Sequence, residues 1–316
     1  MKRKFNILLA RPRGFCAGVV RAIEIVNKAI DRYGAPVYVR HEIVHNKRVI
    51  ENLRARGAIF VKELGDIPDG AVTVFSAHGV SDAIEKEANE RELPVIDATC
   101  PLVSKVHMEG RRHAEQGLEV IMIGHNGHPE VEGTRGRIPG GVKVVSSRED
   151  VFNLQVKNIK KLAFVTQTTL SVDDTRNIIN SLRERFPDIQ GPDLKDICYA
   201  TQNRQQSVRD LCGRIDLLLV VGAQNSSNSN RLKEIGVEMQ VVSHLIDDVS
   251  SFNEDWLSGV SSIGVTAGAS APEVLVEELL SHLGTLGDLK VEEISDITEN
   301  IYFKLPEILR EPVDIQ

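Results

Sequence analysis

The sequence lacks the features that mark membrane, secreted and nucleic-acid-binding proteins. No stretch of its 316 residues approaches the eighteen or so apolar residues of a membrane helix. The basic start MKRKFNILLA has too short an apolar run for a secretory signal. The net charge of −7 argues against a broad surface for nucleic acid, because phosphate binding needs clustered Lys and Arg. We therefore expect a cytoplasmic protein that binds neither a membrane nor nucleic acid.

Two kinds of cofactor motif are also missing. No G-x-G-x-x-G segment follows a predicted strand, and no other nucleotide fingerprint is present, so we expect no bound NAD(P) or flavin. The four cysteines include no C-x-x-C pair, which in a cytoplasmic chain points away from disulfides and from the usual zinc knuckles. What remains is an ordinary globular composition, with 41% hydrophobic and 26% charged residues.

A long repeat organises the chain. Three of the four cysteines, Cys16, Cys100 and Cys198, lie 84 and 98 residues apart. Polar loops recur 29, 28 and 28 residues after them, and again after 62, 68 and 72 residues, at His45, His128, Ser226, His78, Thr168 and Ser270. A period of about 90 residues is too long for a solenoid. We predict three similar α/β units, 1–98, 99–196 and 197–316, each with a cysteine at one corner facing a shared centre.

Strand and helix patterns alternate within each predicted unit. Short apolar runs such as 5–10, 72–77 and 161–166 are typical of buried parallel strands, and the helical pattern over 19–34 closes on a glycine. The first strand of the third unit is weak. This alternation predicts an α/β fold with parallel sheets and right-handed crossovers. Ligands of such folds gather beyond the carboxyl ends of the strands, so the polar loops should face one side.

The repeated cysteines are candidate metal ligands. An isolated cysteine is usually a small buried hydrophobe, and Cys212, on a predicted helix outside the repeat, fits that interpretation. Three converging thiolates suit zinc or an iron–sulfur cluster. A closed structural zinc site would need a fourth ligand, whereas a cubane cluster held by three cysteines leaves one iron open. An open iron can polarise an oxygen of a substrate.

The polar loops form a second set of candidates, which supply hydrogen-bond donors at predicted helix starts: His45, His78, His128, Ser226, Ser227, Asn228 and Ser270. Helix starts favour anions, so a phosphate or diphosphate is the natural ligand. Glu130 follows His128 by two residues. Negative surroundings would raise its pKa and make it a usable proton donor, with Glu132 close enough to compete for this role.

The motifs together resemble a known family. RGFCAGV, HEIVHN, SAHGVS, DATCPLVSKVH, GHNGHPEVEGT, QTTLS, ICYATQNRQ, SSNSNRL and GASAP are similar, in this order, to the 4-hydroxy-3-methylbut-2-enyl diphosphate reductases, over Asn6 to Leu305. The resemblance implies three lobes with pseudo-threefold symmetry around a central [4Fe-4S] cluster. By position it implies cluster ligands Cys16, Cys100 and Cys198, and diphosphate ligands His45, His78, His128, Ser226, Ser227, Asn228 and Ser270. It also implies that Thr168 contacts the substrate hydroxyl and that Glu130 relays protons.

The resemblance further implies a reaction. It is a reductive dehydroxylation of the allylic diphosphate to isopentenyl and dimethylallyl diphosphates, the last step of the methylerythritol phosphate route. Because the chain lacks a nucleotide fingerprint, electrons should come from a separate reduced carrier. The resemblance implies that this carrier is of the flavodoxin or ferredoxin type. Two other classes stay open: a redox-neutral lyase that uses the open iron as a Lewis acid, as quinolinate synthase does, and a cluster-holding sensor without chemistry.

Overall fold

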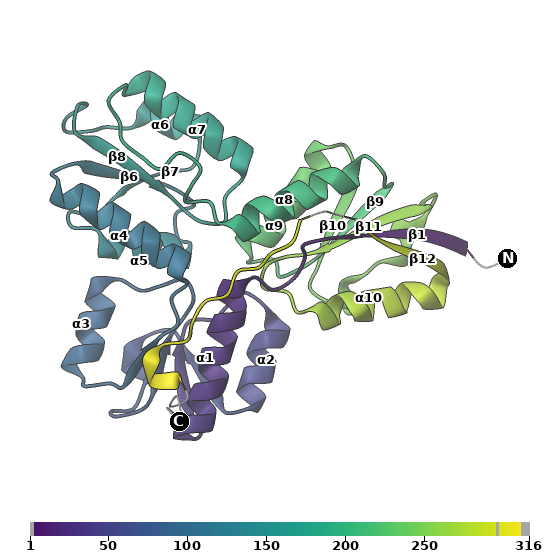
Figure 1. Cartoon of the computed structure of the whole chain (residues 1–316), viewed down its shortest axis with the longest axis horizontal. Coiled ribbons are helices and arrows are strands. Elements are labelled where there is room, and N and C mark those ends of the chain that lie inside the picture. Colours follow the sequence, from purple (N-terminus) through teal and green to yellow (C-terminus); the bar gives the residue numbers. More distant parts are fainter. Residues whose placement is uncertain (1–2, 295–296, 311–316) are drawn as a thin grey trace, which may run out of the picture. The chain divides into compact units, whose positions relative to one another are not determined.

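The chain folds into two compact bodies. The structure, a computed structural model, describes residues 3–294 and 297–310. Body A comprises Met1–Ala17, His45–Val49 and Tyr199–Tyr302, and body B comprises Gly18–Val44, Ile50–Cys198 and Phe303–Gln316. Within the described ranges every strand pairing is parallel, and helices cover the sheets (Figure 1). The predicted α/β class with parallel sheets is confirmed.

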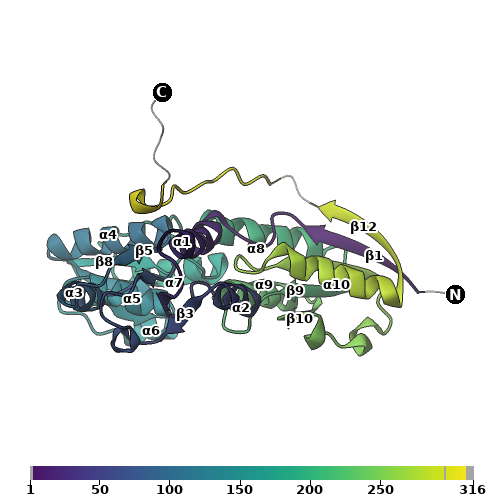
Figure 2. The ribbon, with the colours of Figure 1, turned by 90° about the horizontal axis from the view of Figure 1, so that it is seen from below.

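Body A contains one five-stranded sheet, in the order β10-β9-β11-β1-β12, with β12 beside β1 at its edge (Figure 2). Its strands are β1 (Arg3–Ala10), β9 (Leu217–Val221), β10 (Val242–Ile246), β11 (Ser262–Ala267) and β12 (Gly287–Ile294). Its helices are α8 (Tyr199–Cys212), α9 (Ser227–Glu238) and α10 (Glu273–Leu286), with short 3-10 turns at Val249–Ser251 and Glu254–Leu257.

The strands of this sheet are apolar on both faces because helices cover both. Ile7 and Leu9 of β1 pack in a core with Leu279 of α10, whereas Leu8 packs in a second core with Leu211 of α8. Successive side chains of a strand point to opposite faces, so a continuous apolar run is what a doubly covered strand requires. Because β1, β9 and β11 are parallel, the loops that follow them all lie at the same end of the sheet.

Body B contains two sheets, in the orders β3-β2-β4-β5 and β7-β6-β8. The first is built from β2 (Val37–Arg40), β3 (Ala58–Val61), β4 (Thr73–Phe75) and β5 (Val95–Asp97), with α3 (Asp82–Glu90), a 3-10 turn at Leu64–Asp66 and most of α1 (Ala17–Tyr33) and α2 (Lys47–Ala55), whose first residues are counted in body A. The second is built from β6 (Glu119–Ile123), β7 (Lys143–Val145) and β8 (Leu162–Thr166), with α4 (Pro101–Glu115), α5 (Pro129–Arg137), α6 (Arg148–Asn153) and α7 (Val172–Arg185). A further 3-10 turn, Glu307–Leu309, lies near the end of the chain.

In each of the three sheets, one strand or bridge comes from the segment directly before one of the repeated cysteines. The strand before Cys16, β1, pairs with β11 of body A, and the strand before Cys100, β5, pairs with β4. Before Cys198 only a single bridge, from Gln190 to β8, plays this part, which explains the weak strand signal there. The run 5–10, which we grouped with the first predicted unit, therefore belongs to the sheet of β9–β11. The three-unit division itself stays a prediction.

In the ranges that the structure describes, no helix has both the length and the apolar character needed to cross a membrane. The cytoplasmic location stays a prediction.

Candidate functional site

In body A the Cys16 loop runs from the end of β1 to the start of α1. The Cys16 N–H donates to Ala269 O at 3.2 Å, and the Gly14 N–H donates to Ala267 O at 3.0 Å. Gly14 has φ +67°, and a Cβ there would lie 3.2 Å from Ala271 O. Only glycine adopts this conformation without strain. The loop after β11 thus holds the Cys16 backbone on both sides.

Five of the predicted anion ligands lie in the same body, in loops or at the start of α9. Ser270 Oγ donates to His45 O at 2.9 Å. The N–H of Ala269 donates to Asn228 Oδ1 at 2.9 Å, and Ser226 caps α9 by accepting from the Ser229 N–H at 3.3 Å. Ser227 is the first residue of α9. Because Ala269 also accepts from Cys16, body A brings one cysteine together with five of the predicted binding residues.

Asn228 is the residue of body A that points most clearly to a binding site. Its side chain is buried, with 4% exposed, and its Nδ2 has no hydrogen-bond partner among the residues that the structure describes. A buried donor without a partner is costly, so such a group usually faces a ligand or water. It stands in the first turn of the twelve-residue helix α9, whose amide groups and dipole favour an anion.

Body B holds the other two cysteines. The Cys100 N–H donates to Ala77 O at 3.0 Å, directly before His78, and Cys100 is the N-cap residue of α4. The Cys198 N–H donates to Thr168 O at 3.0 Å. In both bodies the amide of each repeated cysteine is therefore bonded to the carbonyl of a loop that carries predicted site residues. The rings of His78 and His128 lie edge to face, with centroids 5.9 Å apart.

Glu130 and Thr168 form the most distinctive contact of body B. The Thr168 N–H donates to Glu130 Oε1 at 2.7 Å, and Thr168 Oγ1 lies 2.9 Å from Oε2. The Glu130 side chain is buried, at 2% exposed. Burial raises the pKa of this carboxyl from 4.5 to about 7, against the lowering effect of both Thr168 bonds, and the charge of Asp196 adds to the rise.

Glu130 and Glu132, the two candidates for proton donor, have different surroundings. Glu132 has a side chain 45% exposed, pairs with Arg135 at 3.3 Å and accepts from the Gly127 N–H at 3.2 Å. It is an ordinary surface carboxylate of the first turn of α5. Glu130 is the buried acid, and its own N–H donates to His128 Nδ1 at 3.2 Å, which places the ring proton of a neutral His128 on Nε2.

Sequence reasoning missed two residues of these loops. Asn225 Nδ2 lies 3.4 Å from His45 Nδ1, and its only signal was its place one residue before the N-cap of α9. Asp196, two residues before Cys198, is buried and raises the pKa of Glu130. Cys212, in contrast, is buried at the end of α8 as expected, and burial raises the pKa of its thiol to about 11.

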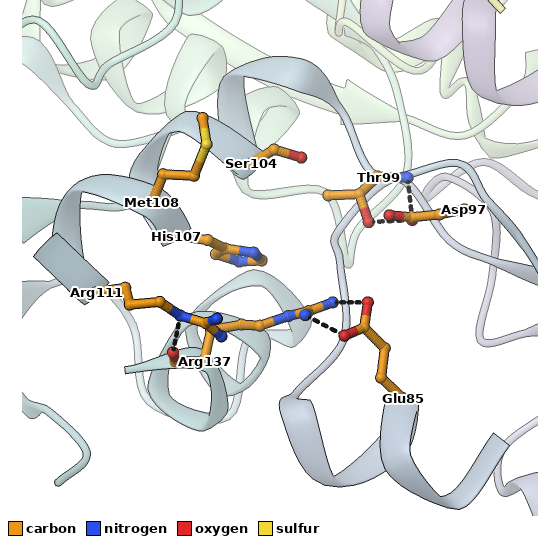
Figure 3. Close-up of a pocket in the computed structure, with 8 residues that line it drawn as sticks. All are labelled: Glu85, Asp97, Thr99, Ser104, His107, Met108, Arg111 and Arg137. Atoms are coloured by element: carbon orange, nitrogen blue, oxygen red, sulfur yellow. Dashed lines mark hydrogen bonds and ion pairs between the residues drawn. The ribbon is translucent and has the colours of Figure 1, made fainter. Parts of the chain in front are cut away.

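A pocket elsewhere in body B contains none of the predicted site residues (Figure 3). His107 lines this pocket, and its Nε2 is buried without a hydrogen-bond partner among the described residues. The two cations that line it are already engaged: Arg137 Nη2 lies 2.6 Å from Glu85 Oε1, and Arg111 Nη2 lies 2.8 Å from both carboxylate oxygens of Asp82. This charge pairing leaves the pocket unsuited to an anionic substrate.

Comparisons with known proteins agree on one family. The family described as LytB protein matches residues 7–284. A relative from Zymomonas mobilis, a 4-hydroxy-3-methylbut-2-enyl diphosphate reductase, is 59% identical over 305 residues, which are 96% of this chain and 90% of the relative. The chain belongs to the LytB family.

Solved LytB-family structures are similar over nearly the whole chain. The E-1-hydroxy-2-methyl-but-2-enyl-4-diphosphate reductase of Plasmodium falciparum has a TM-score of 0.91 and 37% identity, covering 98% of this chain and 96% of that one. A second structure, of (E)-4-hydroxy-3-methyl-but-2-enyl diphosphate reductase, described as the terminal enzyme of the non-mevalonate pathway, has a TM-score of 0.64 and 29% identity. It covers 89% of this chain and 99% of that one.

The cysteines are thiols rather than disulfides: Cys16, Cys100 and Cys198 are half-buried, and Cys212 is buried. Within the described part of the chain, no group of three or more His, Cys, Asp or Glu side chains comes together as a metal site. The cluster ligands expected from the sequence therefore stay a prediction.

Proposed function

We propose that this LytB-family chain is a 4-hydroxy-3-methylbut-2-enyl diphosphate reductase, the enzyme of the terminal step of the non-mevalonate pathway. The substrate loses its allylic hydroxyl as water, and two electrons and two protons enter to give isopentenyl or dimethylallyl diphosphate. The observation that carries the chemistry is the buried acid Glu130, held by Thr168 and with a pKa raised to about 7. A carboxyl with this pKa is half protonated at neutral pH and can deliver a proton to a leaving oxygen.

The donor set fits an iron–sulfur cluster. Cys16, Cys100 and Cys198 are reduced and half-buried, and each lies in a loop whose backbone is held by a hydrogen bond to another loop. Three thiolates are the ligands that a cubane cluster with one open iron takes. When bound, a [4Fe-4S] cluster would supply the electrons and a Lewis-acidic iron for the leaving oxygen. The protein supplies everything else: binding, orientation and protons.

Thr168 gives Glu130 a route to the substrate. When Glu130 is protonated, its Oε2–H can donate to Thr168 Oγ1 across the same 2.9 Å contact, and the Thr168 hydroxyl then turns its own hydrogen outward. The hydroxyl of the substrate is the acceptor that this chemistry requires. The N–H of Thr168 stays on Oε1 throughout and keeps the carboxyl in place. Glu130 is thus the proton donor, and Thr168 transmits the proton.

The diphosphate is bound by the neutral donors of the polar loops. Asn228 contributes its buried Nδ2, and Ser226, Ser227 and the start of α9 contribute hydroxyl and amide groups. Ser270 and the histidines His45, His78 and His128 complete the proposed set. Such a site holds an anion with neutral donors and a helix start, without Lys or Arg.

The electron donor is a separate reduced carrier of the flavodoxin or ferredoxin type. Support comes from the family resemblance and from the reaction, which consumes two electrons, while the sequence has no nucleotide-binding fingerprint for NAD(P)H or a flavin.

Anaerobic incubation of the cluster-loaded protein with the allylic diphosphate tests the proposal. Turnover that consumes two electrons per substrate, supplied by a chemical reductant, supports the reductase. Redox-neutral consumption of the substrate would favour the lyase, and binding without turnover would favour the sensor. A control compound with hydrogen in place of the substrate hydroxyl, which is dimethylallyl diphosphate itself, should take up no electrons, because it has no allylic hydroxyl to lose as water.

A further inference from the structure

Arg204, in the motif ICYATQNRQ, is the largest fully buried side chain of the described chain, and the function described above gives it no task. It lies on α8, and its guanidinium reaches the loop before Cys16. Nε and Nη2 donate to Gly14 O at 3.1 and 2.8 Å, and Nη2 also approaches Phe15 O at 3.4 Å. These are the two carbonyls directly ahead of the cysteine.

Glu299 neutralises this buried cation. Its Oε1 lies 2.9 Å from Arg204 Nη1, and its Oε2 lies 3.3 Å from Nη2. Asn203 Nδ2 also donates to Oε1 at 3.0 Å. The side chains of Arg204 and Glu299 are 1% and 14% exposed, so water screens the pair weakly.

All the N–H groups of Arg204 are therefore committed, since Nη1 also donates to Ala200 O at 3.0 Å. Lysine has neither the fork nor the five donors that this arrangement uses. A second residue of α8, Ser207, donates to Arg11 O at 2.8 Å at the start of the same loop. The face of α8 that carries Arg204 and Ser207 thus fixes the carbonyls of the Cys16 loop, while the loop after β11 fixes its amides.

We infer that Arg204 is a positioning residue for Cys16, and that its charge balance with Glu299 sets the reduction potential of the cluster bound there. The inference rests on the proposed cluster. The potential of an iron–sulfur cluster depends on the net charge and hydrogen bonding around its ligands. Reduction adds a negative charge to the cluster, so a nearby uncompensated cation favours the reduced state and an uncompensated anion disfavours it.

The test is a reductive titration of the cluster-loaded protein, followed by its electron paramagnetic resonance signal. Glu299→Gln should raise the midpoint potential, and Arg204→Gln should lower it. The double variant should return toward the wild-type value. Glu238→Gln is the matched control, because Glu238 makes the same two-oxygen contact with a buried arginine of body A, Arg231, at 2.6 and 2.9 Å. Its midpoint potential should not change.

A merely structural role gives a different pattern. Both single variants would then bind less iron and sulfide, with an unchanged potential in the fraction that is loaded, and the double variant would be no better; this outcome overturns the inference. Glu299→Gln keeps the test decisive if Arg204→Gln does not fold, because glutamine still accepts from Arg204. Amide exchange of residues 13–17 in the cluster-free protein should be faster in Arg204→Gln and unchanged in Glu238→Gln.

Failure of the proposed function can be told apart from failure of this inference. A wild-type protein that binds a cluster with a potential sensitive to Glu299 but does not turn over would refute the reductase and leave this inference standing. Normal turnover together with a midpoint potential that no variant shifts would support the reductase and refute this inference.

Discussion

Replacing Glu130 by glutamine should slow the enzyme and stabilise the protein at the same time. The rate should fall because glutamine cannot donate the proton; lost general acid catalysis typically costs about 10²- to 10⁴-fold. Substrate affinity should change little, because in the proposed mechanism Glu130 lies on the proton route and is not one of the proposed diphosphate ligands. The side chain fits, since the Thr168 N–H can still donate to the amide oxygen and the amide nitrogen can donate to Thr168 Oγ1.

The gain in stability follows from the raised pKa. An acid whose pKa is higher in the folded state than in the unfolded state makes folding less favourable as pH rises. For Glu130 this loss begins near pH 4.5 and is complete above pH 7. At about 1.36 kcal/mol per pKa unit, it amounts to about 3 kcal/mol of unfolding free energy. Glu130→Gln removes this loss, so the variant should match the wild type at pH 4.5 and exceed it at pH 8.

Two measurements check this prediction: single-turnover kinetics of the cluster-loaded protein, and thermal melting of the cluster-free protein at pH 4.5 and pH 8. Glu132→Gln is the control, because Glu132 is exposed and paired with Arg135, and it should leave both quantities nearly unchanged. Equal pH dependence of melting in the wild type and Glu130→Gln would refute the raised pKa. Undiminished turnover in Glu130→Gln would refute its role as proton donor.

Three further predictions concern other residues. Replacing Cys16, Cys100 or Cys198 by Ser should greatly reduce the iron and sulfide content and the brown visible absorbance. Cys212→Ser, a change at a buried packing position, should leave both intact. Loss of the cluster in the Cys212 variant alone would show that the ligands are wrongly assigned. Asn228→Asp should weaken binding of the diphosphate more than tenfold, measured by calorimetry, because it exchanges a buried donor for a negative charge; unchanged affinity would place the anion elsewhere. Burial, reinforced by the charge of Arg137, lowers the pKa of His107 to about 4. The free energy of unfolding should therefore fall by up to about 3 kcal/mol as the pH drops from 6.5 to 4, because the unfolded chain binds the proton more readily. His107→Gln should flatten the fall in melting temperature over that range.

The sequence patterns predict where the helices and strands of this fold lie better than they predict which strands pair. Apolar runs located the strands, and the glycine after α1 marks its end as expected, with Gly34 at φ +80°. The pattern within β1 shows only that both its faces are buried. Nothing in it specifies that β1 pairs with β11, about 250 residues further along the chain. Pairing is a property of the tertiary fold, so local periodicity could not reveal it.

The candidate site shows the same division. The matched offsets of the polar loops singled out His128, Thr168 and Ser226, because a repeat is visible in one dimension. The burial of Glu130 and the exposure of Glu132 depend on how α5 is seated, and two glutamates two residues apart look alike in sequence. Arg204 was hidden for a related reason: a polar residue on an amphipathic helix is usually solvated, and only the contacts with Gly14 and Glu299 show otherwise.

The pairing of the first strand with the last ones also dictates an order of events during synthesis. Both sheets of body B use strands that end by Thr166, with the bridge at Gln190, so they can form while the chain is still emerging from the ribosome. The first strand must wait for β11 and β12, which end at Ile294. The Cys16 loop, whose amides are bonded to Ala267 and Ala269, is therefore the last cysteine loop to be ordered. Loading of the proposed cluster would then be a post-translational step that prematurely shortened chains never reach.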